Sequence, residues 1–347
     1  MLFAQRIGIT AVLIGSSLII GSCAMDNIPE VQQIDGIALL EADPNWPAPM
    51  PEDWSWGQVL GVSVDSQDHI WVTHSAQVVE FDPDGNLLRT WGGPEAGPEW
   101  PGMLHGLFVD HNDYVWSAAR EQHTIFKFTK DGEVVLTIGQ MEEMGNSHDP
   151  YLLGRPAELY VDPDTNELYV ADGYTNRRII VYDAESGEYL RQWGAYGNEP
   201  DDDYQYPEEG TQLSQQFRLL HGITSSKDDL VYVADRTNSR VQVFNQDGTF
   251  VMEQRVSEGP SAAFSLAFST DPDQHFLYVA DGTAHRILIL RRETLEVLGE
   301  VGSEGSGVGQ LGRPHNIATD SKGNLYVAEA NPGMRAQKFS FMGIGSF

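Results

Sequence analysis

Short apolar runs alternate with polar turns along most of the chain, and the runs have the length of β-strands. From Gly61 the sequence reads GVSVDSQDHIWVTHSAQVVEFDPDGNLLRTWG. Asp and Gly mark the turns, while apolar and β-branched residues fill the segments between them. This pattern predicts consecutive antiparallel strands joined by tight connections.

The same pattern recurs in six units. Each has a strand, an Asp/Gly turn, a strand ending in YVAD or a variant, a polar loop, a third strand such as RVQVF, another turn and a fourth strand. The units start at Gly61, His105, Ala157, His221, Ser265 and His315. A four-stranded sheet cannot bury both faces unless neighbouring sheets stack on it around an axis. The repeat therefore predicts a β-propeller.

We predict an all-β chain in which residues 57–347 form a six-bladed β-propeller with four-stranded antiparallel blades. The sixth unit stops after its third or fourth strand. A stretch from Ile34 to Pro49, inside the N-terminal segment 23–56, is therefore expected to add a strand that closes the ring. A linear array of the same sheets would leave two unprotected edges and is less favoured.

Residues 1–22 have the composition of a signal peptide: one basic residue, an apolar run and then small residues. The run ends in IGSC, which resembles the bacterial lipoprotein signal, and Cys23 is the only cysteine. We expect Cys23 to carry lipid and to anchor an exported, monomeric protein in the cell envelope, on the periplasmic or outer-membrane face. The membrane would be contacted only through this anchor. In the alternative, Cys23 is incidental and the mature protein is free.

Acidic residues outnumber basic residues by 51 to 21, which gives a formal net charge of -30. Such a charge repels phosphate backbones and argues against a nucleic-acid partner. The acidic segment from Glu199 to Gly210, between the third and fourth units, could bind calcium or act as a lid, but runs of this kind are usually solvated loops.

Some repeated polar residues have a structural explanation. An aspartate ends three of the YVAD strands, and an arginine follows five residues later in each case: Asp172 and Arg177, Asp235 and Arg240, Asp281 and Arg286. This regularity predicts that the pairs tie neighbouring strands together.

At one position of the repeat, three of the six units carry a histidine and the other three do not. Just before the first strand, the six units carry Leu60, His105, Ala157, His221, Ser265 and His315. Histidine thus occupies alternate blades, so three imidazoles should converge on the axis. Three neutral nitrogen ligands with an open fourth position suit catalytic zinc, although copper, iron or nickel also accept such ligands. The alternative is a polar channel lining without metal.

The loops that follow the second strands carry a second departure from the repeat. They place Tyr174 in the third unit, Arg236 in the fourth and Arg120 in the second. A tyrosine hydroxyl can accept a proton where a metal and arginines stabilise its anion. Arginine pairs with carboxylates through two hydrogen bonds. We therefore expect a small-molecule or peptide substrate that carries a carboxylate.

These motifs resemble the peptidyl-α-hydroxyglycine α-amidating lyase family, six-bladed propellers of the NHL-repeat class. The resemblance rests on HGL at His105, YVADGYTNRRI with Tyr174, LHGI at His221, VADRTNSRVQ with Arg236 and RPHNIA at His315. It implies that the three histidines hold zinc, that Tyr174 is the catalytic base and that Arg236 binds substrate. It also implies a calcium ion at the axis, on backbone oxygens of Val62 and Leu107.

Two positions depart from the family. A second substrate-binding arginine of the family maps onto Ser75, and Arg120 or Arg313 could replace it. The acidic calcium ligand that follows the last histidine is Asn316 here, an amide that should bind calcium more weakly.

The favoured function is a zinc-dependent lyase that cleaves the N–C bond of a carbinolamide, such as a peptidyl-α-hydroxyglycine, to an amide and glyoxylate. One alternative is a non-catalytic, lipid-anchored propeller that binds a peptide or glycan. Another is a calcium-dependent, lactonase-like hydrolase, which would need a cluster of axial carboxylates where this sequence has histidines.

Overall fold

The computed structural model describes residues 36–97, 100–208 and 213–346. They lie in the unit from Ile34 to Phe347. The signal-peptide and Cys23 predictions fall outside the described residues. Within those ranges, the helical segments are three short 3-10 helices: η1 Pro94–Ala96, η2 Arg120–Gln122 and η3 Ala195–Gly197. None of these described helices is long and apolar enough to cross a membrane.

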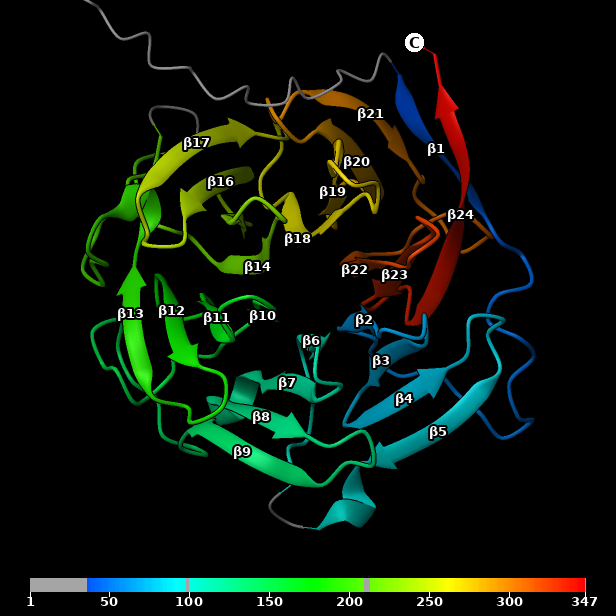
Figure 1. Ribbon diagram of the computed structural model, residues 1–347, viewed down its shortest axis with the longest axis horizontal. Coiled ribbons are helices and arrows are strands. Elements are labelled where there is room, and N and C mark those ends of the chain that lie inside the picture. Colours follow the sequence, from blue (N-terminus) through cyan, green and yellow to red (C-terminus); the bar gives the residue numbers. More distant parts are fainter. Residues whose placement is uncertain (1–35, 98–99, 209–212, 347) are drawn as a thin grey trace, which may run out of the picture. The chain divides into compact units, whose positions relative to one another are not determined.

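The described strands form six antiparallel four-stranded sheets arranged as the blades of a propeller (Figure 1). The all-β, six-bladed prediction is confirmed. Blades one and two comprise β2 Val62–Val64, β3 Ile70–His74, β4 Gln77–Phe81 and β5 Leu87–Gly92, then β6 Leu107–Val109, β7 Val115–Ala119, β8 Thr124–Phe128 and β9 Val134–Gly139. Blades three and four comprise β10 Leu159–Val161, β11 Glu167–Asp172, β12 Arg178–Asp183 and β13 Tyr189–Trp193, then β14 Leu220–Ser225, β15 Leu230–Asp235, β16 Arg240–Asn245 and β17 Phe250–Arg255. Blade five comprises β18 Ala263–Phe268, β19 Phe276–Asp281, β20 Arg286–Arg291 and β21 Val297–Val301.

Blade six is assembled from both ends of the described chain. Its sheet order is β1-β24-β23-β22, from β1 Ile37–Ala42, β22 Pro314–Thr319, β23 Leu325–Glu329 and β24 Arg335–Gly345. Strand β1 pairs antiparallel with β24, Ile37 opposite Gly345 and Ala42 opposite Phe339. The strand from the N-terminal segment therefore supplies the outer edge of the last blade and closes the ring.

The first strand of each blade faces the axis. These innermost strands contact one another in sequence around the ring, and β22 returns to β2. Apolar side chains fill the spaces between blades, with separate buried clusters at the interfaces; Trp71, Trp116, Tyr169 and Tyr278 are among the largest fully buried side chains. Because each core lies between two blades, no blade can form its core alone.

The predicted Asp–Arg ties are present in three blades, with one correction. Asp235 pairs with Arg240 at 2.8 Å and Asp281 with Arg286 at 3.2 Å. In blade three, however, Asp172 pairs with Arg178 at 3.0 Å rather than with Arg177. The loop of that blade is one residue longer, so the next arginine falls in register, and Arg177 turns toward the backbone oxygen of Tyr204.

Candidate metal centre

The three histidines of the register position meet at the axis. His105, His221 and His315 are buried, and one ring nitrogen from each lies within 4.8 Å of those of the other two. Their ring centroids are 4.7 to 5.1 Å apart. Residues from alternate blades, far apart in sequence, therefore form one cluster.

A backbone carbonyl of the neighbouring blade orients each imidazole. The Nδ1–H of His105 donates to Ala157 O at 2.8 Å, and that of His221 donates to Phe264 O at 2.7 Å. The Nδ1–H of His315 donates to Leu60 O at 2.7 Å. A hydrogen bond at Nδ1 leaves Nε2 as the atom with the free lone pair. All three rings are thereby set in the same tautomer.

Burial keeps the cluster neutral. It lowers the pKa of His315 to about 3 and lowers the pKa values of His105 and His221 well below their ordinary range; the charges of Arg236 and of neighbouring histidines act in the same direction. Neutral imidazole is the form that binds metal.

Tyr174 lies over this cluster. Its hydroxyl is 3.1 Å from His105 Nε2 and 3.2 Å from His221 Nε2, and Arg236 Nη1 donates to the hydroxyl oxygen at 3.4 Å. One O–H proton can satisfy only one imidazole lone pair, so at least two of the three Nε2 atoms lack a donor among the described residues. Converging neutral lone pairs of this kind fit a zinc ion with three protein ligands.

Local backbone structure places Tyr174 and Arg236 at equivalent positions. Arg236 is the first residue after the aspartate that ends the second strand of its blade, and Tyr174 is the second, because Gly173 is inserted before it. Tyr174 N–H donates to Arg155 O at 3.4 Å, and Arg236 N–H donates to Leu219 O at 3.3 Å. Next to Tyr174, a side chain on Gly173 would place its Cβ 1.9 Å from Leu220 O, so only glycine allows this loop to approach blade four so closely.

A cavity of about 400 Å³ opens above the cluster. Its lining includes Tyr174 and His315 together with three arginines, Arg120, Arg236 and Arg313. Arg120 stacks 4.5 Å from the ring centroid of Tyr174, and Arg236 lies 3.7 Å from that of Phe264. The structure thus brings the predicted tyrosine and both predicted arginines to one cavity.

The arginines in this cavity differ in their partners. Arg120 is paired with Glu121, which also binds Arg155. Arg236 donates to Ser261 Oγ at 3.2 Å, and among the described residues neither Arg236 nor Arg313 has a carboxylate within salt-bridge distance. Two positive charges are therefore available to an anionic ligand.

The predicted calcium ligands lie one layer further along the axis. Asn316 Oδ1 accepts the N–H of Val62 at 2.6 Å, and its amide nitrogen donates to Ser265 Oγ at 3.1 Å and to Glu158 Oε1. The Asn316 side chain is thus fully engaged with protein atoms. The buried Glu158 beside it was missed in the sequence, although it is visible there as the acidic residue one position after the histidine register, where the second and fourth units have glycine.

The comparisons with known proteins agree with this fold. A model of the NHL repeat matches residues 217–244, in blade four. The chain is 29% identical over 313 residues to NHL repeat-containing protein 3 of Mus musculus, covering 84% of this chain and 81% of that protein.

A second relative bears on the chemistry. The chain is 28% identical over 342 residues to peptidyl-alpha-hydroxyglycine alpha-amidating lyase 1 of Drosophila melanogaster, covering 85% of this chain and 58% of that protein. Among solved structures, a streptogramin B lyase matches with a TM-score of 0.58 at 12% identity, over 89% of this chain and 98% of that chain, which shows the fold alone. The chain is therefore homologous both to amidating lyases and to NHL repeat-containing proteins, as the resemblance predicted.

Proposed function

We propose that this protein is a metal-dependent lyase that cleaves the N–C bond of a carbinolamide such as a peptidyl-α-hydroxyglycine, releasing an amide and glyoxylate. The observation that carries the proposal is the convergence of three neutral Nε2 atoms with the Tyr174 hydroxyl, 3.1 and 3.2 Å from two of them. Homology to amidating lyases supports the reaction class.

His105, His221 and His315 would hold the metal through Nε2, and three nitrogen ligands favour zinc. A bound zinc ion would supply a Lewis acid beside the substrate hydroxyl. The protein contributes the fixed tautomers, the buried surroundings and an open side of the cluster that faces the cavity.

Tyr174 would act as the base, with Arg236 close enough to stabilise the phenolate. The substrate hydroxyl gives its proton to the Tyr174 oxygen, and the electron pair of the O–H bond forms the C=O bond of glyoxylate. As the C–N bond breaks, nitrogen keeps the bonding pair and takes a proton back from Tyr174. The amide leaves, and Tyr174 returns to its starting state.

Arg236 and Arg313 would bind the carboxylate that becomes part of glyoxylate. Both line the cavity beside Tyr174, and neither is neutralised by a carboxylate of the described residues. In a chain of net charge -30, two such arginines form a local anion site. The resemblance places the family's second arginine at Ser75, so Arg313 would make that contact from another blade.

The test measures metal content and glyoxylate release together, on a peptide that ends in α-hydroxyglycine. We expect about one zinc per chain and glyoxylate release in the wild type. Replacing the three histidines by alanine should abolish both. Tyr174→Phe should keep the metal and lower the rate by about 10²- to 10⁴-fold, the usual contribution of a general base.

The controls distinguish a lyase from a binding propeller. His111→Ala, a histidine outside the cluster, should retain metal and activity. Stoichiometric metal that persists in the triple variant would refute the centre. Metal without glyoxylate release, and no difference between the wild type and Tyr174→Phe, would instead favour a non-catalytic propeller, as the similarity to NHL repeat-containing protein 3 allows.

A further inference from the structure

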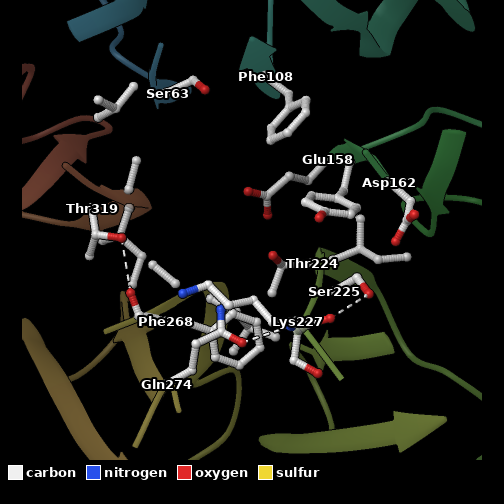
Figure 2. A pocket seen from close by; sticks show the side chains of 18 of the residues that line it. Ser63, Phe108, Glu158, Asp162, Thr224, Ser225, Lys227, Phe268, Gln274 and Thr319 are labelled. Atoms are coloured by element: carbon white, nitrogen blue, oxygen red, sulfur yellow. Dashed lines mark hydrogen bonds between the residues drawn. The ribbon is translucent and has the colours of Figure 1, made fainter. Parts of the chain in front are cut away.

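The two ends of the propeller axis carry opposite charges. One cavity, shown in Figure 2, has a volume of about 450 Å³ and is lined by the innermost strands and the turns that follow them. Its charged groups are four carboxylates and one lysine: Glu158, Asp162, Asp164, Asp229 and Lys227. The cavity beside Tyr174 has three arginines in its lining and, among the described residues, no acidic side chain. An anion is therefore attracted to the end of the axis that holds Tyr174.

Next to Tyr174, two arginines share a single carboxylate. Arg120 approaches Glu121 Oε1 through Nε at 2.8 Å and through Nη2 at 2.6 Å, and Arg155 Nη2 donates to the same oxygen at 2.6 Å. Their guanidinium carbons lie 4.5 Å and 6.0 Å from the centroid of the Tyr174 ring. Nη1 of Arg120 and both Nε and Nη1 of Arg155 have no hydrogen-bond partner among the described residues. The pair thus keeps one net positive charge and unused donors beside the tyrosine.

Arg236 and Arg313 add further positive charge to the same cavity. Arg236 Nη1 lies 3.4 Å from the Tyr174 hydroxyl, and Arg313 is part of the cavity lining. Burial lowers the pKa of Arg236 below its ordinary value, and the positive charges of Arg313 and Arg120 act in the same direction. These arginines therefore repel one another when no anion lies between them.

A substrate with one carboxylate balances only part of this charge. Four guanidinium groups and the one carboxylate of Glu121 give a net charge of +3 around Tyr174. The carboxylate that becomes part of glyoxylate, bound by Arg236 and Arg313, would reduce this charge to +2. Arg120 and Arg155 would still have unused donors, and arginine binds carboxylates through parallel hydrogen bonds.

We propose that the substrate carries two acidic groups, and that Arg120 and Arg155 bind the second one, a carboxylate on the acyl part of the carbinolamide. This inference rests on the proposed lyase function and names the class of carbinolamide that the site takes. Glu121 acts as a positioning residue, because it holds both guanidinium groups beside Tyr174.

The chemistry of the cleaved bond locates the second carboxylate. The carbon that becomes the aldehyde carbon of glyoxylate bears the hydroxyl, the first carboxylate, a hydrogen and the leaving nitrogen, so it has no place for another acidic group. The second carboxylate therefore belongs to the acyl group on nitrogen. In a peptide, the side chain of an aspartate or glutamate that precedes α-hydroxyglycine supplies it.

Binding of two unreactive peptides tests the proposal without the chemical step. Acetyl-Glu-Gly and acetyl-Gln-Gly both end in the glycine carboxylate and lack the hydroxyl that the reaction needs, so they differ in the second charge. Each is titrated by calorimetry into the purified full chain, given one equivalent of zinc. The Kd of acetyl-Glu-Gly should be about 10- to 100-fold lower, the usual contribution of hydrogen bonds to a charged group. Equal Kd values, or no binding of either peptide, would overturn the proposal.

Variants assign the preference to particular arginines. Arg120→Ala and Arg155→Ala should each remove most of the preference for acetyl-Glu-Gly and leave the Kd of acetyl-Gln-Gly unchanged. Arg255→Ala, which removes an arginine paired with the exposed Glu258, should retain the preference. A preference that persists in both variants, or an equal loss of binding of both peptides, would show that Arg120 and Arg155 do not bind a second carboxylate. The wild-type comparison remains decisive if either variant fails to fold.

Kinetics separates this proposal from the lyase function. With the corresponding α-hydroxyglycine peptides, kcat/KM for glyoxylate release should be higher for the glutamate peptide by the same factor. Equal kcat/KM values would overturn the second carboxylate site and leave the lyase function intact. A preference for acetyl-Glu-Gly in binding, without glyoxylate release from either hydroxyglycine peptide, would refute the lyase function and retain the site for two carboxylates.

Discussion

At the scale of single residues, the histidine centre depends on atoms that are common to every blade. His105, His221 and His315 donate through Nδ1 to main-chain carbonyls of the next blade, and this contact turns each Nε2 toward the axis. A histidine at another position would lack that carbonyl. His69, for example, lies beside Asp65 and Glu80, whose carboxylates are already bound by Lys130 and Arg89.

The arginines of the cavity allow a prediction at this scale. Arg236→Ala and Arg313→Ala should each raise KM for the carboxylate substrate about 10- to 100-fold, since a hydrogen bond to a charged group contributes roughly 1.5–3 kcal/mol. The measurement is steady-state kinetics of glyoxylate release. Arg255→Ala, which removes an arginine paired with the exposed Glu258 outside the cavity, serves as the control.

A substrate analogue makes the arginine prediction specific. With the carboxylate converted to a neutral amide, the wild type and both arginine variants should have similar KM values, because the charge that the arginines recognise is absent. An equal loss on both substrates would show that these arginines act on protein structure instead of on the carboxylate.

At the scale of elements, the loop after each second strand determines which side chain reaches the cavity. The buried aspartate at the strand end anchors this loop: Asp172 accepts from Gly154 N–H and Asn176, and Asp235 accepts from Arg218 N–H and Asn238. The loop of blade three holds one residue more than that of blade four, which moves the paired arginine from 177 to 178. Tyr174 still reaches the cavity because the extra residue is taken up by the loop.

The close approach of this loop to blade four gives a prediction at the element scale. Gly173→Ala should lower the free energy of unfolding by about 1–3 kcal/mol, the usual cost of forcing an atom into a packed site. It should also reduce activity, because the added Cβ would clash with Leu220 O. Gly173 precedes Tyr174 and Leu220 precedes His221, so the clash would displace both side chains of the site. Urea denaturation and kinetics check both effects.

A matched glycine separates this clash from the general effect of adding a methyl group. A Cβ on the exposed Gly102 would have no heavy atom within 4 Å, so Gly102→Ala should change stability by no more than about 0.5 kcal/mol. If Gly173→Ala were equally neutral, the contact between its loop and Leu220 would not constrain the site.

At the scale of the whole molecule, the propeller is a ring whose closure involves strands from distant parts of the sequence. Strand β1 completes the sheet of β22, β23 and β24, and it also contacts β21 of blade five. Since the buried clusters lie between blades, opening the ring at this sheet would expose apolar surface on both sides. The ring should therefore unfold as one cooperative unit.

A disulfide across the closing strands tests this view. Glu41 and Ser340 are paired residues of β1 and β24, and antiparallel partners have Cα separations that a disulfide can span. With Cys23 replaced by serine, Glu41→Cys with Ser340→Cys should raise the stability of the oxidised protein. The chain-entropy estimate is about 5 kcal/mol for a loop of roughly 100 residues, and this loop is longer.

Calorimetry of the oxidised and reduced forms gives the comparison, and the reduced protein is its own control. We expect a single transition in both forms, shifted upward in the oxidised one. Separate transitions for different blades, of which only one responds to the disulfide, would contradict cooperative closure.

Much of the propeller fold and of the histidine cluster could be predicted from the sequence, because both follow from the pattern that the six units share. Alternating apolar residues and Asp/Gly turns are local signals, and six copies of them imply stacked blades. The histidines stood out for the same reason, since His105, His221 and His315 share one register position. Convergence at the axis then follows from the approximate symmetry of the ring.

Other features depended on the tertiary structure, because they involve contacts between residues that share no local pattern. Nothing in the sequence pairs Glu158 with Asn316, which meet only where opposite blades face each other across the axis. Arg313 likewise joins Arg236 around Tyr174 through the folding of three separate blades. A repeat determines each blade and the order of the ring, whereas the partner of a buried charge depends on which side chains the closed ring brings within hydrogen-bond distance.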